Sequence, residues 1–205
     1  MPAIKNIIFD FGAVLFDIDY QKTIAAFRQL GIAHFDTMYD QFTVNTLFEE
    51  LETGKISEEA FYEALKKEIQ LPVSNQQLEK AWNAILLDFR LESMAYLEQL
   101  SAHYNLYLLS NTNSIHHRRF HQLYKPIPSK PSMDDYFTKV YYSHLIHLRK
   151  PYPAIYEFVL QDAGILAAET LFIDDSSNNI AAAAKLGIQT HLLLSTEKIE
   201  TLGII

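Results

Sequence analysis

The chain has 205 residues, of which 49% are hydrophobic and 20% are charged, as in ordinary globular proteins, so wholesale disorder is excluded. It contains no cysteine, which excludes disulfides, thiolate zinc sites and a cysteine nucleophile and fits a reducing compartment. Its formal net charge of -8 disfavours nucleic-acid binding. The N-terminus lacks the features of a signal peptide, and no apolar run reaches membrane-spanning length. We therefore expect a cytoplasmic protein that binds neither membranes nor nucleic acids.

Five short apolar runs predict strands that are covered on both faces. They are rich in β-branched and aromatic residues and are bounded by turn or polar residues. Helical patterns lie between the later runs, and two of these patterns stop at a glycine, Gly164 and Gly187. Alternation of strand and helix indicates a parallel sheet with helices on both faces. The predicted strands are residues 5–9, 104–110, 139–143, 170–174 and 189–194.

The segment from residue 19 to residue 88 has a different pattern and contains no convincing strand. Its amphipathic runs predict helices, and Ser57 and Ser74 have the sequence context of helix starts. We therefore expect an α/β protein with a doubly wound, Rossmann-like parallel-sheet core, formed by residues 1–18 and 89–205, and an all-helical cap, residues 19–88, inserted after the first strand. The predicted cap helices are 21–31, 36–54, 57–71 and 74–89, and a Pro- and Ser-rich surface loop is expected at 125–135.

Polar side chains follow four of the predicted strands. In an open parallel sheet, ligands bind outside the carboxyl ends of the strands, where the strand order switches. Each group alone has an ordinary structural interpretation, such as a helix cap or a turn. The adjacent carboxylates of Asp174 and Asp175, however, repel each other unless a cation intervenes. Together the groups predict a site for phosphate and a divalent metal such as Mg²⁺. They are Asp10, Ser110 to Asn113, Arg149 to Pro151 and Asp174 to Asn178.

These segments resemble the motifs of the haloacid dehalogenase superfamily of phosphatases. The sequence DFGAVL from Asp10 resembles the first motif and LLSNT, which ends at Thr112, the second. The sequence RKP from Arg149 resembles the third and IDDSSNNI from Ile173 the fourth. The match covers nearly the whole chain, and residues 19–88 resemble the smaller, helical type of cap. More narrowly, the same segments resemble bacterial sugar phosphatases of the α-D-glucose-1-phosphate phosphatase type.

The resemblance implies a role for each matching residue. Asp10 would be the nucleophile that forms an aspartyl-phosphate. Asp10, the carbonyl of Gly12 and Asp175 would hold Mg²⁺, with Asp174 close by or acting through water. Lys150, together with Ser110 and Asn111, would bind the transferring phosphoryl group and offset its charge. The expected substrate is a small phosphorylated metabolite, with hexose phosphates the leading expectation. The oligomeric state is not indicated.

The sequence departs from the family pattern at Gly12. Most phosphatases of this superfamily carry an aspartate there, which protonates the leaving oxygen and then activates water. Glycine transfers no proton, so three hypotheses stay open. The chain is a phosphatase that uses water or a cap residue instead, a metal-independent haloacid dehalogenase, or a catalytically weakened binding protein. The Asp174–Asp175 pair argues against the second hypothesis, and the retained Asp10, Ser110 and Lys150 argue against the third.

Other groups carry weaker expectations. Asp17 and Asp19 lie where the chain enters the cap, and either is a candidate for the missing acid or a solvated hinge carboxylate. The histidines of residues 116–121 have helical spacing, but a solvated helix face is favoured over a metal site or a nucleic-acid surface. Most of the cap aromatics are expected in the cap core, with one or two facing the substrate. These aromatics are Tyr39, Phe42, Phe48, Phe61, Tyr62 and Trp82, and the histidines are His116, His117 and His121.

Overall fold

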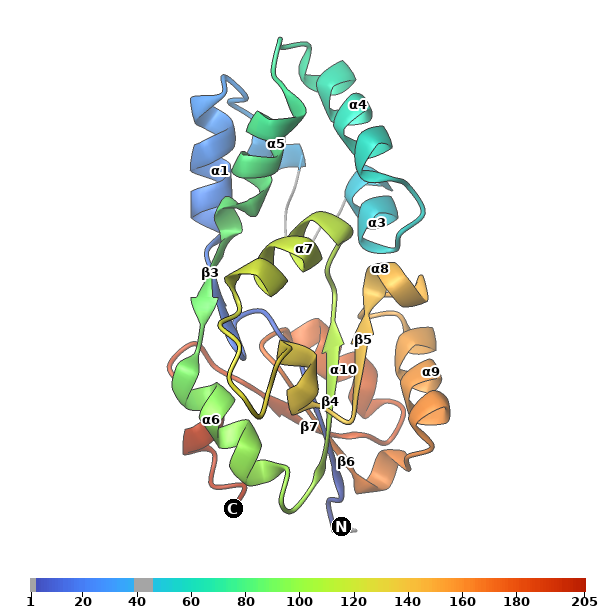
Figure 1. Ribbon diagram of the computed structural model, residues 1–205. Helices are drawn as coiled ribbons and strands as arrows, with labels where there is room; N and C mark the ends of the chain where they lie inside the picture. Colours follow the sequence, from blue (N-terminus) through green and yellow to red (C-terminus); the bar gives the residue numbers. More distant parts are fainter. Residues whose placement is uncertain (1–2, 39–45) are drawn as a thin grey trace.

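Five parallel strands form the centre of the protein, in a computed structural model that describes residues 3–38 and 46–205 (Figure 1). Their order across the sheet is β5-β4-β1-β6-β7. Each strand coincides with one of the five predicted apolar runs, so the prediction of a parallel α/β sheet is confirmed. The strands are β1 (Asn6–Phe9), β4 (Asn105–Ser110), β5 (Lys139–Tyr142), β6 (Thr170–Asp174) and β7 (Gln189–Leu192).

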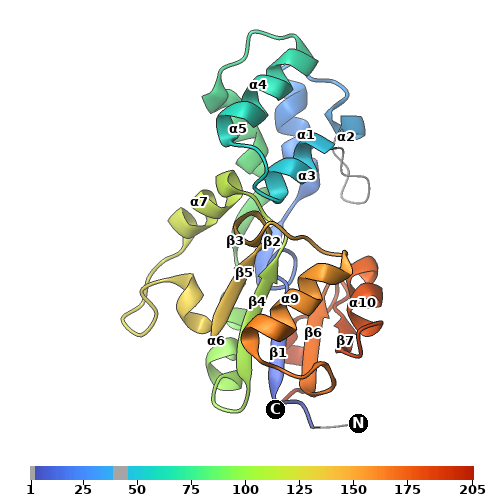
Figure 2. The same ribbon diagram turned by 90° about the vertical axis from the view of Figure 1, so that its right-hand side faces the viewer.

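Side chains of the central strands alternate between two buried layers, as the period of a strand requires. Ile7 and Phe9 of β1 point into a cluster with helix α6 (Leu91–Leu100). Ile8 points to the opposite face, where it packs with α9 (Pro153–Ala163) and α10 (Ser177–Ala184). Figures 1 and 2 show helices on both sides of the sheet, which explains why the strands are apolar at nearly every position.

A separate group of helices lies above the carboxyl ends of the strands and forms a cap (Figure 2). Its aromatic side chains build their own core, which includes Phe27, Phe48, Phe61 and Trp82. Ser57 and Ser74 cap the helices that follow them, as predicted, and Ser74 does so in a capping box with Gln77. The cap helices are α1 (Tyr20–Gln29), α2 (Phe35–Met38), α3 (Thr46–Glu52), α4 (Glu58–Ile69) and α5 (Asn75–Trp82).

A two-stranded antiparallel ribbon joins the cap to the core, and sequence analysis missed it. It consists of β2 (Phe16–Ile18) and β3 (Leu86–Phe89). The prediction of one helix over residues 74–89 is therefore wrong, because α5 ends at Trp82 and a 3₁₀ turn, η1 (Asn83–Ile85), leads into β3. The apolar residues of β3 suit a helix or a strand equally, and the partner strand that decides lies about seventy residues earlier.

Two helices that follow strands of the sheet contact the cap. Helix α7 (Ser114–Leu123) follows β4, and α8 (Ser143–Ile146) follows β5. A side chain at Gly54, in the turn after α3, would collide with the carbonyl oxygen of His144 in α8. The imidazole Nδ1 of His147 lies 2.8 Å from the carbonyl oxygen of Thr53 in the same turn. The cap therefore rests directly on the core beside α8.

The segment expected as a surface loop, 125–135, links α7 to β5 and ends in a 3₁₀ turn, η2 (Met133–Tyr136). Further 3₁₀ turns are η3 (Ala167–Glu169) and η4 (Ile199–Thr201). The start of the described chain and the C-terminus lie at the bottom of the core, far from the cap (Figure 1). Within 3–38 and 46–205, no helix combines the length and apolar character that crossing a bilayer requires.

Candidate active site

The predicted site residues meet where the direction of the chain connections changes. The connection from β1 leads toward β4, whereas that from β6 leads toward β7, so the switch point lies between β1 and β6. Asp10 follows β1 and Asp174 ends β6, so both carboxylates lie at this point. A cavity of about 450 Å³ opens above them, between the core and the cap. Asp10, Gly12, Ser110, Asn111, Lys150 and Asp175 all line it.

Three carboxylates gather at the floor of this cavity. Asp10, Asp174 and Asp175 each offer an oxygen, and these oxygens lie within 4.8 Å of one another. The ammonium of Lys150 is the cation in contact with them, so the three carboxylates outnumber it by two charges. Oxygen ligands with an excess of two negative charges suit a hard divalent cation such as Mg²⁺. The residues expected to hold the metal are thus brought together.

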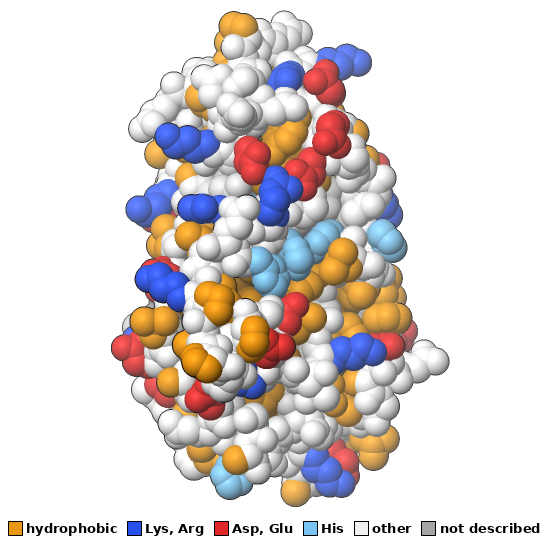
Figure 3. Space-filling model, viewed as in Figure 1, with side chains coloured by type: hydrophobic (Ala, Val, Ile, Leu, Met, Phe, Trp, Pro, Cys, Tyr) orange, Lys and Arg blue, Asp and Glu red, His pale blue; other side chains and the backbone are white. Residues whose placement is uncertain are grey.

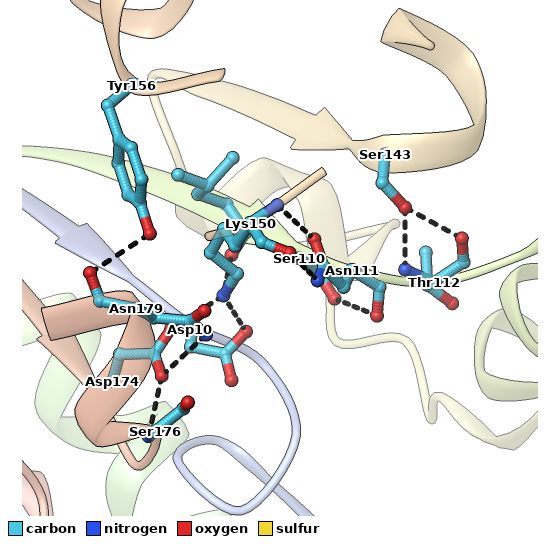
Figure 4. A network of polar contacts seen from close by, with 11 residues as sticks. Asp10, Ser110, Asn111, Thr112, Ser143, Lys150, Tyr156, Asp174, Ser176 and Asn179 are labelled. Carbon is cyan, nitrogen blue, oxygen red and sulfur yellow. Dashed lines mark hydrogen bonds and ion pairs between the residues drawn. The ribbon is translucent and has the colours of Figure 1, made fainter. Parts of the chain in front are cut away.

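Lys150 is buried between two of these carboxylates (Figure 4). Its Nζ lies 2.7 Å from an oxygen of Asp10, 2.7 Å from one of Asp174 and 2.9 Å from the carbonyl oxygen of Leu109. These contacts use all three of its N–H donors. Burial lowers the pKa of Lys150, but the two carboxylates outweigh burial and hold its pKa above the ordinary value. In this structure Lys150 therefore orients and neutralises carboxylates, and binding of a phosphoryl oxygen requires that it exchange or share a donor.

Asp10 is almost fully enclosed at the end of β1. Burial raises the pKa of its carboxyl to about 7, against the attraction of Lys150, which lowers it. Asp174 and Asp175 add to the rise. A cation at the floor of the cavity would oppose this shift and keep Asp10 ionised, which is the form that can act as a nucleophile.

The two adjacent aspartates of the fourth motif have different environments. Asp174 is fully buried and accepts hydrogen bonds from Lys150, from the backbone N–H of Ser176 and from the amide of Asn179 (Figure 4). Asp175 faces the cavity and is only partly buried. Asn179 was not among the predicted site residues, because the sequence pattern alone does not distinguish a residue at the start of a helix from one that holds Asp174.

The segment after β4 positions the third motif. The side-chain amide of Asn111 accepts a hydrogen bond from the backbone N–H of Lys150 and donates one to its carbonyl oxygen, both at 2.9 Å. The hydroxyl of Ser143 bonds the backbone N–H and carbonyl of Thr112 in a similar way. Asn111, which was expected to bind phosphate, thus uses its side chain on Lys150. Ser110 keeps its hydroxyl at the cavity wall, with one long contact of 3.5 Å to the carbonyl of Asn111.

Neither candidate for the missing acid faces the cavity. Asp17 pairs with Arg90, with 2.6 Å between its carboxylate and the guanidinium Nε. Asp19 caps α1 by accepting a hydrogen bond from the backbone N–H of Gln21. The expectation that Asp17 or Asp19 replaces the acid at Gly12 is therefore not supported by their positions. Both carboxylates are engaged in these contacts at the ribbon that leads into the cap.

The cap contributes acidic groups that sequence analysis did not single out. Glu49 and Glu52 of α3 line the cavity, and Glu52 is buried. An oxygen of Glu52 lies 3.1 Å from the guanidinium of Arg149, and one of Glu49 lies 3.8 Å from it. Burial raises the pKa of Glu52, while Arg149 opposes the rise. No local sequence pattern indicates these residues, because the side of a cap helix that faces the cavity depends on how the cap packs against the core.

The expectation that most of the cap aromatics pack in the cap core is confirmed for the four that the structure describes. Phe48, Phe61, Tyr62 and Trp82 all lie in the cap core, as expected, but none of these four lines the cavity. The cap-side aromatic at the cavity is instead Tyr20, at the start of α1. Tyr39 and Phe42, also expected in the cap core, lie outside the described residues.

The prediction that the histidines of α7 form a solvated face is wrong for His116, whereas His117 and His121 are partly exposed. His116 is buried, stacks on Trp82 at 4.7 Å between ring centres and contacts the Trp82 carbonyl at 3.1 Å. His117 and His121 form a band with His144 at the junction of cap and core (Figure 3). In the part of the chain that the structure describes, the acidic cluster is the one group of residues with metal-ligand spacing. The basic side chain Arg118 pairs with Glu58 and Glu79 of the cap.

The chain is similar to several known proteins. It is 36% identical over 191 residues to a D-ribitol-5-phosphate phosphatase of Bacteroides thetaiotaomicron, covering 91% of this chain and 90% of that protein. It is 30% identical to a sesquiterpene phosphatase of Aspergillus oryzae, covering 90% of this chain and 87% of that protein. The chain also superimposes, with a TM-score of 0.91 at 33% identity, on the crystal structure of a point mutant of a HAD family enzyme from Bacteroides thetaiotaomicron. That enzyme was solved in complex with magnesium and inorganic phosphate. That match covers 96% of this chain and 97% of that one.

The sequence profile of one hydrolase family matches residues 4–187, which is most of the chain. The match runs from β1 to the end of α10 and so includes every element that carries a residue of the acidic cluster. The fold, the position of the carboxylates at the switch point and this match agree. The chain belongs to the haloacid dehalogenase-like hydrolase family.

Proposed function

We propose that the protein is a Mg²⁺-dependent phosphatase that hydrolyses a small phosphorylated metabolite, with a sugar or polyol phosphate as its substrate. The observation that carries the proposal is the cluster of Asp10, Asp174 and Asp175 around Lys150, which has an excess of two negative charges. A metal-independent dehalogenase has no use for a divalent-cation site. The two relatives named as phosphatases, of D-ribitol 5-phosphate and of a sesquiterpene, also support phosphate ester hydrolysis.

The ligands of the metal would be Asp10, Asp175 and the backbone carbonyl of Gly12. Asp174 fits a supporting position, because the protein already occupies both of its oxygens with hydrogen bonds. When bound, Mg²⁺ supplies positive charge to the phosphoryl oxygens as negative charge builds on them. A protein structure similar to this one was solved with magnesium and inorganic phosphate together, which supports the same pair of ligands here.

The proposed reaction has two steps. A carboxylate oxygen of Asp10 bonds to phosphorus and the bond from phosphorus to the substrate oxygen breaks, which gives an aspartyl-phosphate and an alcohol once that oxygen takes a proton. Water then attacks phosphorus, the bond to Asp10 breaks, and inorganic phosphate leaves. Lys150 keeps Asp10 in place through the 2.7 Å contact, and the hydroxyl of Ser110 is available to a phosphoryl oxygen.

The proton for the departing oxygen has no donor at Gly12. Asp17 and Asp19 are occupied by Arg90 and by the start of α1. We propose that water in the cavity supplies this proton. We therefore expect the rate to depend on the leaving group, because an ester whose oxygen departs without a proton does not need an acid at position 12.

The direct test is phosphate release from p-nitrophenyl phosphate, with Mg²⁺ and with EDTA. The parent protein should be active with Mg²⁺ and inactive in EDTA. Asp10→Asn should lower kcat by at least about 10³-fold, because the amide is nearly isosteric and cannot attack phosphorus. Activity of Asp10→Asn within tenfold of the parent would contradict the covalent step. Release of chloride from 2-chloropropionate in EDTA would instead establish the dehalogenase.

A further inference from the structure

Each of the two cationic side chains that line the cavity, Lys150 and Arg149, is already held by two carboxylates. The ammonium of Lys150 lies 2.7 Å from an oxygen of each of two aspartates at the floor. The guanidinium of Arg149 lies 3.1 Å from an oxygen of Glu52 and 3.8 Å from one of Glu49, both on the cap helix α3. Each cation is therefore outnumbered by its carboxylate partners, and neither has surplus charge to offer a further anion.

In the part of the chain that the structure describes, no other side chain at the cavity adds a positive charge. His116 also lines the cavity, but burial lowers its pKa to about 4, so its ring is neutral near pH 7. The side formed by the ribbon is apolar, with Phe16, Ile18 and Leu86. The segment 39–45, outside the described residues, contains no lysine, arginine or histidine. The surplus positive charge would thus come from the proposed Mg²⁺ at the floor, and the phosphoryl group would use it.

We propose that the cap-side wall, formed by Glu49, Glu52 and Arg149, excludes a second anionic group, so that the substrate is a phosphate monoester whose remaining groups are uncharged. This inference rests on the proposed phosphatase function and deepens it by naming the class of substrate. The cap-side wall admits the hydroxyl groups of sugar and polyol phosphates. It rejects bisphosphates and phosphorylated carboxylic acids.

The charge of the cap-side wall carries this discrimination. Two carboxylates and one guanidinium give it a net charge of about -1 when all three groups are ionised. Burial raises the pKa of Glu52, and a protonated Glu52 would leave the wall neutral, which still offers no cation to a second anion. A carboxylate of the substrate would lose water at this wall and gain no compensating charge, whereas a hydroxyl carries no charge to bury.

Glu49 is the acidic group of the cap-side wall that a substrate can approach. Its side chain is 30% exposed, whereas that of Glu52 is 10% exposed and that of Arg149 is 12% exposed. Glu49 also makes the longer of the two contacts with the guanidinium. Neutralising Glu49 should therefore leave the pair of Glu52 and Arg149 in place and remove the surplus negative charge of the wall.

The test compares two five-carbon esters, D-ribitol 5-phosphate and D-ribonate 5-phosphate, which differ only in a terminal hydroxymethyl group or carboxylate. With Mg²⁺, the parent should prefer the ribitol ester in kcat/KM by about 10²-fold or more, and added salt should reduce this preference. Glu49→Gln should reduce it about tenfold, through faster turnover of the ribonate ester. The matched control is Glu50→Gln, which removes the same charge from the same helix. Glu50 does not line the cavity, so the preference should stay unchanged.

Glu49→Lys, which adds a positive charge to the cap-side wall, is the second variant and should favour the ribonate ester further. Melting temperatures show which variants fold. An unchanged preference in folded Glu49→Gln or Glu49→Lys would overturn the proposal. A parent that hydrolyses both esters equally well would overturn the inference alone and leave the proposed function standing. No release of phosphate from either ester or from p-nitrophenyl phosphate would overturn the proposed function itself, and the inference with it.

Discussion

The side-chain amide of Asn111 holds the backbone of Lys150 from both sides, through one accepted and one donated hydrogen bond of 2.9 Å each. Asn111 follows β4 and Lys150 follows β5, so this pair ties together two neighbouring strand ends. The position of the buried Lys150 ammonium between Asp10 and Asp174 thus depends on a residue that touches neither carboxylate.

Loss of the Asn111 amide should therefore misplace Lys150. We expect Asn111→Ala to lower kcat for p-nitrophenyl phosphate by about 10- to 100-fold, since small displacements of catalytic groups are costly. The control is Asn105→Ala, which removes a side-chain hydrogen bond at the other end of β4, the 3.1 Å contact to Asn6. Both variants should lose some stability, but kcat should fall only in Asn111→Ala. Equal kcat values in the two variants would show that Lys150 is placed by other contacts.

Substitutions of the two adjacent aspartates should affect stability and metal binding differently. Asp174→Asn weakens a fully buried ion pair with Lys150 and should lower the free energy of unfolding by about 3 kcal/mol. Asp175→Asn should leave it unchanged or raise it, because burial raises the pKa of Asp175 and so disfavours its charged form. Urea unfolding in EDTA measures both effects.

Mg²⁺ gives the complementary measurement. A cation that binds the folded protein raises its melting temperature, and this rise should be lost in Asp175→Asn and only reduced in Asp174→Asn. If the larger loss occurred in Asp174→Asn, the assignment of the direct ligand would be reversed.

Gly12 should make the leaving group decisive. We expect the parent to hydrolyse p-nitrophenyl phosphate faster than n-pentyl phosphate by about 10²-fold or more, because the aryl oxygen departs without a proton. A Cβ atom at Gly12 would approach Cδ1 of Ile18 to 3.2 Å, so an added carboxylate needs room there. Gly12→Asp combined with Ile18→Val should raise the rate for the alkyl ester more than for the aryl ester, with Ile18→Val alone as the control. Equal rates for the two esters in the parent would mean that a protein group donates the proton.

The histidine band predicts a dependence of stability on pH. Burial, together with repulsion from His117 and His147, lowers the pKa of His144 to about 4. Burial and repulsion from His121 lower that of His117 to about 4. Unfolding returns both to about 6.5, so between pH 7 and pH 5 these two histidines bind protons in the unfolded chain that they do not bind in the folded protein, and their contribution lowers stability as the pH falls.

Urea unfolding at pH 7, 6 and 5 in EDTA measures this fall. His144→Asn should flatten it, because one of the groups responsible is gone. His103→Asn, at an exposed position on the turn after α6, should not. The same slope in the parent and in His144→Asn would show that the pH dependence arises elsewhere.

The sheet and the floor of the site could be predicted from the sequence because their signals are local. A buried parallel strand is apolar at nearly every position, and the polar residue directly after it marks its carboxyl end, as at Asp10 and Asp174. Contacts between distant segments leave no such signal. The pairing of β2 with β3, the facing of Glu52 toward Arg149 and the use of Asn111 by Lys150 all depend on how segments dock, which no single stretch of sequence encodes.

The same limit explains the error at His116. A polar, histidine-rich run with helical spacing has the composition of a solvated face, yet His116 stacks on Trp82 of the cap. The cap covers a surface of the core that would otherwise meet water, so composition alone misjudged which side of α7 is exposed.

The chain enters and leaves the cap through adjacent strands of one ribbon, with Ile18 opposite Leu86 and Asp19 bonded to the carbonyl of Ile85. Paired residues in antiparallel strands have Cα atoms about 5 Å apart. A helical unit whose two ends lie that close can be removed or exchanged without disturbing the parallel sheet, since insertions are tolerated where the ends already meet. The cavity floor belongs to the core and much of its roof to the insert, so replacing the insert would change the substrate while Asp10, Lys150, Asp174 and Asp175 stay in place. Such an architecture would let one cavity floor serve new substrates by exchange of the inserted unit, with the cluster of Asp10, Lys150, Asp174 and Asp175 kept unchanged.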